Sequence, residues 1–458
     1  MKLTKDLNFF EVDNNLYIAY APLKKVLASI NRDGQLFINF IKKYPDFEVD
    51  EERNPNFSKF IEFLYKSGLI DGKDCSLPPE PQPNFEPTEV ILLPTYNCNL
   101  RCVYCYANSG DSAKATMSRE LGRAAIDHVL KNSQNKGTKK VVLAFHGGGE
   151  PTVAWPLVIE VIGYAKAKSS ENGIDLRIQI TTNGVLSDKK REWIINNDIG
   201  IQVSFDGPRD IQNIQRPILG GIGSFDQVLK TIRFFEKKHH PYGIQTVITK
   251  ASVMRMVEIV DFFHEVSGIK EIHFEPLFMC GRCIYSGWEE PAANDFIPEF
   301  LKAWKHAASL SINLHTSLSS LDSIHSSFCG AAGRNFIVSP EGNVTACLEV
   351  PNFRDSRSEI FIYGSYNNEK KFVINQDKLT FLASRNIYNM PGCRNCFAAW
   401  HCGGDCLAKS LSIGKLFDPS QTERCSMAKT LTLEQLKTIL FQPEIGSKIG
   451  IKVFEFQF

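Results

Sequence analysis

Apolar and polar residues alternate in three short segments near the start of the chain, at positions 9–12, 16–20 and 26–30. This period of two predicts three β-strands. Two segments with apolar residues at helical spacing follow, one beginning near Gly34 and one after Pro55, where proline suits the first turn of a helix. Residues 1–74 are therefore expected to form a small module of strands and helices.

Residues 75–88 separate this module from the rest of the chain. Five prolines lie between positions 75 and 87. Proline cannot donate to a sheet ladder, and a proline-rich segment favours an extended, semi-rigid spacer. We interpret these residues as a linker between domains.

A regular alternation of strand and helix patterns runs from residue 89 to residue 314. Strands are predicted at 90–93, 141–145, 176–182, 201–205, 244–249 and 271–277, and helices at 119–131, 154–167, 225–237 and 253–266. Repeated βα units build a parallel sheet, and six units are fewer than the eight of a closed barrel. The predicted fold class is α/β, with a partial (β/α)6 TIM barrel.

The alternation fades beyond residue 315, where glycines and cysteines become frequent. Residues 315–458 are expected to form a loop-rich domain that is held together by something other than a large apolar core. The pattern predicts a last helix at 431–440 and an edge strand in the tail at 449–458.

The charge of the chain is close to neutral, with 52 Lys and Arg against 51 Asp and Glu. A net charge of +1 provides no long-range attraction to nucleic acid or to an anionic membrane, so neither is expected as a partner. No apolar run approaches the ~18 residues that span a bilayer, and the amino terminus lacks the apolar stretch of a signal peptide. We therefore expect a cytoplasmic protein.

The chain has 13 cysteines, an odd number that favours metal or redox chemistry over disulfides. The first group is Cys98-x3-Cys102-x2-Cys105, directly after the first barrel strand. At this spacing one loop can place three thiolates around an iron–sulfur cube and leave the fourth iron open. Zinc is the alternative, but a structural zinc ion takes four ligands and no fourth Cys or His lies nearby in the sequence.

This motif, with Tyr104 before its third cysteine, resembles the signature of the radical S-adenosylmethionine (SAM) enzymes. The resemblance implies a [4Fe-4S] cluster that binds SAM, and cleavage of SAM to a 5′-deoxyadenosyl radical that takes a hydrogen from the substrate. It also implies SAM contacts on the loops after the second, third and fourth barrel strands. With Tyr104, the implied contacts are Gly147, Gly148, Gly149, Glu150, Thr182, Asn183, Ser204 and Asp206. Taken singly, these residues are equally typical of turns and helix caps.

Seven further cysteines resemble the SPASM extension of peptide- and protein-modifying radical SAM enzymes, which binds two auxiliary [4Fe-4S] clusters. The resemblance implies three clusters in total and two ligand sets. It assigns Cys393, Cys396, Cys402 and Cys425 to the outer cluster, and Cys329, Cys347 and Cys406 to the inner one. Metal ligation can supply folding free energy where apolar burial is thin. A pair of zinc ribbons is the alternative.

The inner set is one cysteine short. Cys280 and Cys283, just after the sixth barrel strand, are the nearest further cysteines. Either one of them completes the inner cluster, or its open iron binds a substrate thiolate or another donor. Cys75, in the linker, is interpreted as an incidental thiol.

The amino-terminal module resembles the RiPP recognition element, a PqqD-like winged-helix module that binds the leader peptides of ribosomally made natural products. A leader could add as a strand beside residues 26–30 and lay apolar side chains against the helix after Pro55. The implied leader contacts are Val26, Leu27, Ala28, Ser29, Ile30, Phe57, Phe60 and Leu64. Alternatively, the aromatic residues form the core of the module itself. The module has no dense basic face for DNA.

The leading hypothesis is a radical SAM peptide maturase, an oxidoreductase that installs a sulfur-to-carbon or carbon-to-carbon cross-link in a precursor peptide. Flavodoxin or ferredoxin would be the external electron donor. One alternative is an anaerobic sulfatase-maturating enzyme, which forms formylglycine; in that group an Asp follows the second SPASM cysteine, where this chain has Leu348. Another is an electron-transfer or scaffold protein that cleaves no SAM. Weak candidates for a catalytic base are Glu275, Glu349 and Asp405.

Overall fold

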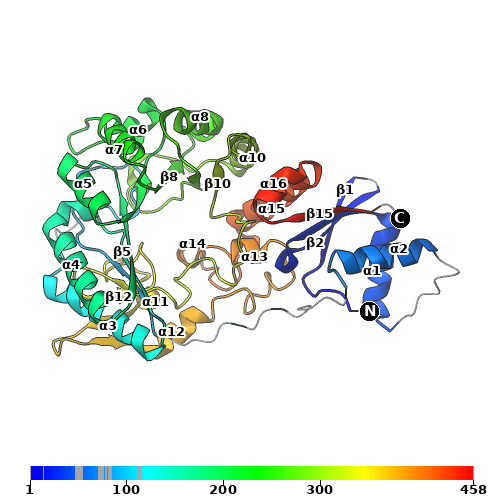
Figure 1. Cartoon of the computed structure of the whole chain (residues 1–458), viewed down its shortest axis with the longest axis horizontal. Coiled ribbons are helices and arrows are strands. Elements are labelled where there is room, and N and C mark those ends of the chain that lie inside the picture. The colour runs from blue at the N-terminus through cyan, green and yellow to red at the C-terminus, as the bar shows by residue number, and fades with distance from the viewer. Residues whose placement is uncertain are drawn as a thin grey trace.

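The structure is a computed structural model that describes residues 2–13, 15–46, 55–70, 77, 80, 85–111 and 115–456. Figure 1 shows a large α/β domain and a smaller module beside it, with both ends of the chain on the module. Cys75 and most of the predicted linker lie outside the described residues. Among the described helices, none has the length and apolar character needed to cross a membrane.

The amino-terminal module has the strands and helices that its pattern predicts. They are β1 (Asn8–Asp13), β2 (Leu16–Ala21), β3 (Val26–Asn31), α1 (Arg32–Lys43) and α2 (Pro55–Lys66), with a 3-10 turn at Pro22–Lys24. The sheet has a fourth strand, β15 (Lys452–Glu455), from the carboxyl end of the chain, and the strand order is β1-β2-β3-β15. The tail is therefore an edge strand, as predicted, and it lies in the amino-terminal module.

The six predicted barrel strands are confirmed within one or two residues at each end. They are β4 (Glu89–Leu92), β5 (Lys140–Phe145), β6 (Asp175–Thr182), β7 (Gly200–Ser204), β8 (Tyr242–Ile248) and β9 (Glu271–Pro276). All neighbouring pairs in this series run parallel. Parallel strands place their carboxyl ends at one edge of the sheet, so the loops that follow them meet there.

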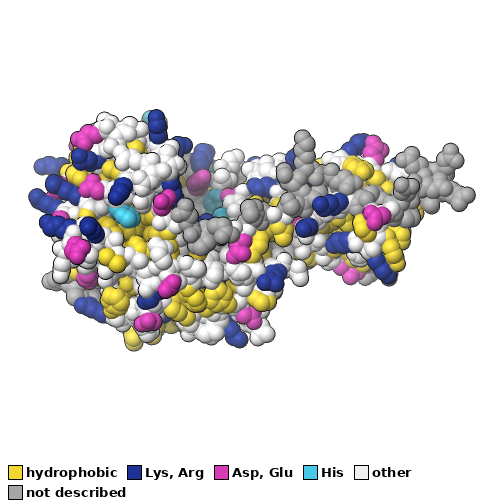
Figure 2. Space-filling view, turned by 90° about the horizontal axis from the view of Figure 1, so that it is seen from below, with side chains coloured by type: hydrophobic (Ala, Val, Ile, Leu, Met, Phe, Trp, Pro, Cys, Tyr) yellow, Lys and Arg dark blue, Asp and Glu magenta, His cyan; other side chains and the backbone are white. Residues whose placement is uncertain are grey.

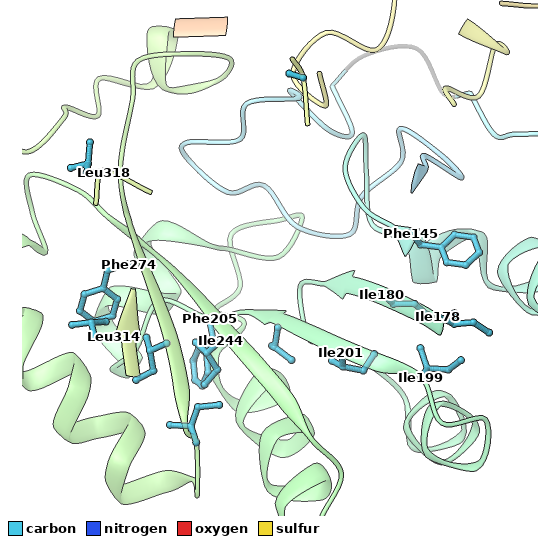
Figure 3. Packing of buried hydrophobic residues seen from close by; sticks show 14 of the residues in the cluster. Phe145, Ile178, Ile180, Ile199, Ile201, Phe205, Ile244, Phe274, Leu314 and Leu318 are labelled. Atoms are coloured by element: carbon cyan, nitrogen blue, oxygen red, sulfur yellow. The ribbon is translucent and has the colours of Figure 1, made fainter. Parts of the chain in front are cut away.

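Helices connect these strands on the outer side of the sheet (Figure 1). They are α3 (Arg119–Asn135), α4 (Trp155–Glu171), α5 (Asp188–Asn196), α6 (Arg209–Gln215), α7 (Phe225–Lys237), α8 (Met256–Val266) and α10 (Ala293–Ser309). The short helix α9 (Cys283–Ser286) follows β9 and packs instead against residues 102–104, in the loop after β4. Figure 3 shows part of the core, in which Ile180, Ile201 and Ile244 come from three successive strands. This continuous apolar packing holds the strand ends, and therefore the loops, in fixed positions.

The predicted boundary between residues 314 and 315 does not separate two sheets. A seventh parallel strand, β10 (Asn313–His315), crosses it and pairs with β9. On the other side of the sheet, β11 (Ile337–Val338) pairs parallel with β4, and β12 (Asn343–Thr345), β13 (Ile362–Tyr366) and β14 (Phe372–Ile374) continue as an antiparallel meander. The open edge of the partial barrel is thereby paired, because unpaired backbone donors and acceptors are costly to bury.

The rest of the carboxyl-terminal part consists of short helices and loops. The helices are α11 (Ser358–Phe361), α12 (Gln376–Ala383), α13 (Ala399–Cys402), α14 (Leu407–Ser412), α15 (Glu423–Phe441) and α16 (Pro443–Lys448). The predicted last helix, at 431–440, is the second half of the longer α15. Figure 2 shows charges of both signs interspersed over the visible face of the molecule.

The amino-terminal module packs directly on this carboxyl-terminal part. Tyr20 of β2 and His401 of α13 share a hydrogen bond of 2.7 Å that is buried. The rings of Phe10 and Phe397 meet edge to face at 4.4 Å, and Lys25 Nζ donates to the carbonyl of Asp322 over 2.6 Å. The module is thus a docked part of the molecule, beside the helix that carries Cys402.

Candidate cluster and cofactor site

The first cysteine group lies on the loop after β4, here called the cluster loop (residues 93–111). Burial raises the pKa of Cys102 to about 12, and repulsion from Cys105 and Cys98 adds to the shift. The pKa of Cys98 is about 11 for similar reasons. The three thiols are therefore close enough to interact, and a bound cationic iron site would be needed to hold them as thiolates.

Two arginines hold the carbonyl groups of the cluster loop. Arg101 Nη1 donates to the carbonyls of Cys98 and Leu100, over 2.9 Å and 2.8 Å. Arg282, from the loop after β9, donates from Nη1 to the carbonyl of Cys102 over 2.6 Å and from Nη2 to that of Ser109 over 2.8 Å. The cysteine triad is thus fixed from within its own loop and from a segment far along the chain.

The segment around Arg282 also approaches the cluster loop through its backbone. Arg282 N donates to the carbonyl of Cys105 over 2.9 Å. A Cβ on Gly281 would lie 2.3 Å from that same carbonyl oxygen, and the φ of Gly281 is +58°. Only glycine fits this contact without displacing backbone.

Tyr104 and Asp206, both implied SAM contacts, form a buried network with each other. The Tyr104 hydroxyl donates to the Asp206 carboxylate, which also accepts from Gln215 Nε2 over 2.7 Å and from the backbone N–H of Val247 over 3.1 Å. Arg216 Nε donates to the Tyr104 hydroxyl over 2.6 Å. Asp206 is fully buried, and these contacts tie the cluster loop to β7 and β8.

The glycine segment after β5 packs against the cluster loop. A Cβ on Gly149 would lie 2.2 Å from the carbonyl oxygen of Asn97, and the backbone N–H of Glu150 donates to that oxygen over 2.9 Å. A Cβ on Gly148 would meet the carbonyl oxygen of Thr95 at 3.1 Å. In the structure, these glycines permit close contact between two loops, a role additional to the implied ligand contact.

Glu150 joins the loops after β5 and β6. Its Oε1 accepts from the hydroxyl of Thr182 over 2.8 Å, and its Oε2 accepts from the backbone N–H of Asn183 over 2.8 Å. Asn183 Nδ2 in turn donates to Asn99 Oδ1 over 2.8 Å, in the cluster loop. Ser204, half-buried, is the last residue of β7 at the same edge of the sheet. The structure thus gathers the implied SAM residues around the cysteine triad.

The remaining cysteines fall into two groups. The inner group is Cys329, Cys347 and Cys406, and the outer group is Cys393, Cys396, Cys402 and Cys425. Burial raises the pKa of Cys329 to about 11, and repulsion from Cys406 adds to the shift. Burial also raises the pKa of Cys347, and repulsion from Cys406 and Cys329 adds to that shift. In the outer group, burial raises the pKa of Cys402 to about 12, and repulsion from Cys393 and Cys396 adds to the shift. Burial and repulsion from Cys396 also raise the pKa of Cys425. These interactions lie within each group, and the assignment of the two groups to two clusters stays a prediction.

The inner group lies next to the cluster loop. Tyr106, directly after Cys105, is buried, and the charges of Cys105, Glu349 and Cys347 add to the effect of burial in raising its pKa. A Cβ on Gly147 would lie 2.9 Å from the side chain of Leu348. Loops from the barrel and from the carboxyl-terminal part therefore share one site.

The two unassigned cysteines differ in their surroundings. Cys283 is fully buried, and its thiol donates to the carbonyl of Cys280 over 2.8 Å. Cys280 is half-exposed and borders a cavity of about 290 Å³ together with Lys409 and Arg424. Lys409 hydrogen-bonds to Cys280, and its own pKa is raised, despite burial, by Glu349, Cys280 and Cys406. Cys280 thus shares a charged neighbour, Lys409, with Cys406 of the inner group.

Two of the three candidate bases are held in ion pairs. Glu349 accepts from Lys409 over 3.0 Å and from Arg357 over 3.2 Å. Asp405 accepts from Arg424 Nε over 2.6 Å and from the backbone N–H of Cys406 over 2.7 Å. Both carboxylates therefore serve to orient cations around the inner group.

Glu275 is bound by hydroxyl and imidazole donors. It accepts from the Ser317 hydroxyl over 2.6 Å and lies 3.0 Å from His273 Nε2. Burial would raise its pKa, but these partners, together with Arg424, lower it. The group is therefore a carboxylate at neutral pH and a poor proton acceptor.

Within the described part of the chain, no three or more Cys, His, Asp or Glu side chains converge closely enough to hold a single metal ion. An iron–sulfur cube takes its cysteines around its corners and not around one point. The three cysteine groups are the donors that such clusters would use.

Comparison with known proteins supports this interpretation. Residues 92–263 match the family model of the radical SAM superfamily. The chain contains a radical SAM domain. The matched segment extends from β4 to α8 and includes the cysteine triad, the glycine segment and Glu150.

Relatives of this radical SAM domain include peptide- and protein-modifying enzymes. The radical SAM cyclopropyl synthase TigE of Paramaledivibacter caminithermalis is 22% identical over 443 residues, which cover 88% of this chain and 89% of TigE. A cysteine-type anaerobic sulfatase-maturating enzyme of Clostridium perfringens is 25% identical over 202 residues, 43% of this chain. An uncharacterized protein of Methanocaldococcus jannaschii, MJ0907, is 32% identical over 188 residues, 41% of this chain. These last two matches span 53% and 62% of the relatives' own lengths.

Solved structures share the fold. The sulfatase-maturating enzyme anSMEcpe with bound AdoMet superposes with a TM-score of 0.59 at 18% identity, over 77% of this chain and 98% of that one. Streptococcus suis SuiB bound to its precursor peptide SuiA superposes with a TM-score of 0.51 at 16% identity, over 93% of this chain and 99% of SuiB. The chain therefore shares its fold with anSMEcpe and SuiB over most of its length.

The residues that were predicted to contact a leader peptide are engaged by other parts of the same chain. The edge of β3 beside Val26–Asn31 is paired with β15. Phe60 and Leu64 are fully buried in the module's own apolar cluster, and Phe57 packs at its border. Phe60 and Leu64 are therefore core residues of the module, as the alternative interpretation predicted. A helix packed on a small sheet must bury its apolar face against that sheet.

Proposed function

We propose that the protein is a radical SAM peptide maturase that installs a sulfur-to-carbon or carbon-to-carbon cross-link in a ribosomally made precursor peptide. The observation that carries the proposal is that the inner group of cysteines lies next to the cysteine triad and the glycine segment that leads into the Glu150 network, at one edge of the parallel sheet. A radical SAM domain alone would need only the first group. The inner group adjoins the cluster loop, so a cluster bound there would lie beside the reaction chamber.

The residues of the barrel edge would hold the cofactor. Cys98, Cys102 and Cys105 would ligate the SAM cluster, and Gly147–Gly149, Glu150, Thr182, Asn183 and Ser204 would surround SAM. When bound, the cluster supplies an electron that cleaves SAM to a 5′-deoxyadenosyl radical, which removes a hydrogen from the peptide. Tyr104 and Asp206 would position the cluster loop through their buried network. Flavodoxin or ferredoxin would be the external electron donor.

The inner and outer groups would hold two auxiliary [4Fe-4S] clusters. The outer group has four cysteines and would close its cluster. The inner group has three, and Cys280, which shares Lys409 as a neighbour with Cys406, would be the fourth ligand; Cys283 donates to a backbone carbonyl instead. Lys409 and Arg424 would balance the charge of the inner thiolates, since both cations are buried beside Cys406.

SuiB supports a peptide as substrate, and TigE bears on the kind of bond that is formed. SuiB, which shares the fold over 93% of this chain, is bound to a precursor peptide in its structure. TigE is a cyclopropyl synthase and aligns over 88% of this chain. A cyclopropyl group requires a new carbon–carbon bond, which favours the carbon-to-carbon form of the proposed product.

A sulfatase-maturating enzyme is the second candidate, and the likeness to anSMEcpe favours it. Leu348 argues against it. In this position, after Cys347, the apolar side chain packs toward Gly147 and supplies no proton acceptor. We therefore place cross-link formation first.

The test is anaerobic incubation of the reconstituted enzyme with SAM, a reductant and the precursor peptide encoded beside the gene. The proposal predicts 5′-deoxyadenosine and a peptide lighter by two hydrogens; a thiol-blocking reagent then separates a thioether from a carbon–carbon link. A cysteine-to-aldehyde change would instead identify the sulfatase-maturating activity. Absence of 5′-deoxyadenosine would support an electron-transfer protein. A Cys102→Ser variant should be inactive, whereas a Cys283→Ser variant should retain SAM cleavage.

A further inference from the structure

Arg385, which follows α12, is a fully buried arginine beside the outer group of cysteines; 1% of it is exposed. Its Nε donates to the carbonyl of Leu416, and its Nη2 donates to the hydroxyl of Ser410 over 3.4 Å. Within the described part of the chain, no carboxylate lies within ion-pair distance of this guanidinium, and Asp405 is paired with Arg424 over 2.6 Å instead. Arg385 is therefore a buried cation whose bonding partners are uncharged.

One nitrogen of Arg385, the buried Nη1, has no hydrogen-bond partner among the described residues. A Cβ placed on Gly404 would lie 3.0 Å from this nitrogen. Gly404 belongs to the short segment that joins Cys402 of the outer group to Cys406 of the inner group, and its backbone N–H donates to the Cys402 sulfur over 3.3 Å. The unpartnered N–H groups of Arg385 thus border the segment that carries two of the predicted cluster ligands.

The chain compensates the charge of Arg385 only in part. Burial lowers the pKa of its guanidinium, and the charges of Cys393 and Asp405 offset part of this effect. Among the described residues, the other arginine that is buried this deeply is Arg191, and it is paired with Asp188. Buried charges are normally paired, because removing an ion from water is costly. Apart from Asp405, the charges that favour the cationic form of Arg385 are those of thiols.

The surroundings of the outer group strengthen the effect of a charge placed there. Cys393 is buried in a small apolar cluster with Met390 and Trp400, and charges interact more strongly in such surroundings than in water. Lys429 also approaches this group and hydrogen-bonds to Cys425, but it is half-exposed and solvent screens its charge. Arg385 is the fully buried cation of the outer group.

We propose that Arg385 is the counter-ion of the auxiliary cluster at the outer group, where its Nη1 donates to a sulfur atom. This inference rests on the proposed function for the presence of that cluster. A [4Fe-4S] cluster with four thiolate ligands is an anion, and it gains one further negative charge when it accepts an electron from the external donor. A nearby cation and hydrogen bonds to the sulfur atoms favour the reduced form and raise the reduction potential. Arg385 thus acts as a positioning residue that retains the outer cluster and raises its potential.

The first test measures how much the clusters stabilise the full-length protein. Arg385→Met is compared with the matched control Arg191→Met, since each replaces a fully buried guanidinium by an unbranched apolar side chain. Cluster-loaded and cluster-free forms of both variants are unfolded in urea under anaerobic conditions. Arg191→Met should destabilise both forms equally. Arg385→Met should remove part of the stabilisation that the clusters provide, and an iron chelator should remove its outer cluster at least about tenfold more readily, as expected for one hydrogen bond with a charged partner.

The second test measures reduction potentials by EPR-monitored titration. The background variant Cys98→Ala/Cys102→Ala/Cys105→Ala removes the ligands of the SAM cluster, so the signals come from the auxiliary clusters. Adding Arg385→Met should shift one auxiliary potential to a more negative value, and adding Arg191→Met should shift neither. Equal potentials in both variants, together with equal destabilisation of their loaded and cluster-free forms, would show that Arg385 only supports the fold and would overturn the inference.

A third measurement applies even where Arg385→Met does not fold. In protein labelled with 15N-arginine, pulsed EPR of the reduced auxiliary clusters should detect coupling to a guanidinium nitrogen. Arg385→Lys keeps the cation but has no guanidinium, so this coupling should weaken in that variant. Identical spectra of the unchanged protein and Arg385→Lys would contradict the proposed contact.

The inference and the proposed function fail separately. If the potential and cluster retention change as predicted but no cross-linked peptide forms, the role of Arg385 stands and the maturase function falls. If the peptide is cross-linked and Arg385→Met leaves both quantities unchanged, the function stands and the inference falls. If the unchanged protein assembles the SAM cluster alone, the inference falls together with the assignment of the outer cluster.

Discussion

Arg282 offers the sharpest test of how the cluster loop is held. Its guanidinium donates to the carbonyls of Cys102 and Ser109, and both bonds are lost in Arg282→Ala. A hydrogen bond with one charged partner contributes about 1.5–3 kcal/mol, so the two bonds together are worth at least about 3 kcal/mol. The ion pair with Asp111, which is half-exposed, adds less than about 1 kcal/mol.

A loss of about 3 kcal/mol corresponds to a roughly 100-fold larger population of the opened loop. Hydrogen exchange of the cluster-free protein measures this population, because the backbone N–H groups of Arg101 and Val103 are bonded to the carbonyls of Pro217 and Gln215 and exchange only when the loop opens. We expect roughly 100-fold faster exchange at these two amides, and less iron retained after reconstitution.

The matched control is Arg209→Ala, which removes an arginine whose ion pair with Asp226 is exposed. This variant should leave exchange of the cluster loop and iron content unchanged. If Arg282→Ala and Arg209→Ala have the same exchange rates at Arg101 and Val103, the claim that a distant segment fixes the cysteine triad is wrong.

Three further predictions concern buried polar groups. Asp206→Asn removes the charge opposite Arg216, and leaving that cation buried should lower the free energy of unfolding by about 3–5 kcal/mol; a denaturation midpoint equal to that of the unchanged protein would refute this role. The Cys102 thiol keeps its proton up to about pH 12 when folded but ionises near 9 when unfolded, so cluster-free protein should lose stability as the pH rises from 9 to 12. Cys102→Ser should make this decline shallower. Tyr20→Phe removes the buried bond to His401, should cost about 1 kcal/mol, and should increase proteolysis between the module and the remainder of the chain.

The elements of the fold followed from local patterns. Strands with a period of two and helices with a period near 3.6 were predicted within a few residues in the module and from β4 to β9. The short helices α5 and α6 and the two-residue strand β11 were not, because segments of this length carry little periodic signal. Their positions depend on partners elsewhere in the chain, such as the pairing of β11 with β4.

For the candidate site, too, some residues were predicted from the sequence and others were found only in the structure. Cysteine spacing indicated the first group, and the resemblance to the SPASM extension implied the division of seven further cysteines into two groups. In the structure, burial and repulsion from a neighbouring thiol raise the pKa of Cys102, Cys329 and Cys402, one from each group. Arg282 and Lys409 were not singled out, although the first fixes the cluster loop and the second joins Cys280 to the inner group. No motif marks such residues, since their role depends on which carbonyl or thiol lies opposite them after folding.

The sequence by itself determined the chemistry: which thiols are present, at what spacing, and on which loops of a parallel sheet. Only the tertiary structure decided what those loops touch. Backbone contacts at Gly149 and Gly281, the Asp206 network, and the pairing of β15 with β3 all join segments that are distant in the sequence. Hydrogen bonding and close packing select these partners by geometry in three dimensions, which local patterns along a chain do not encode.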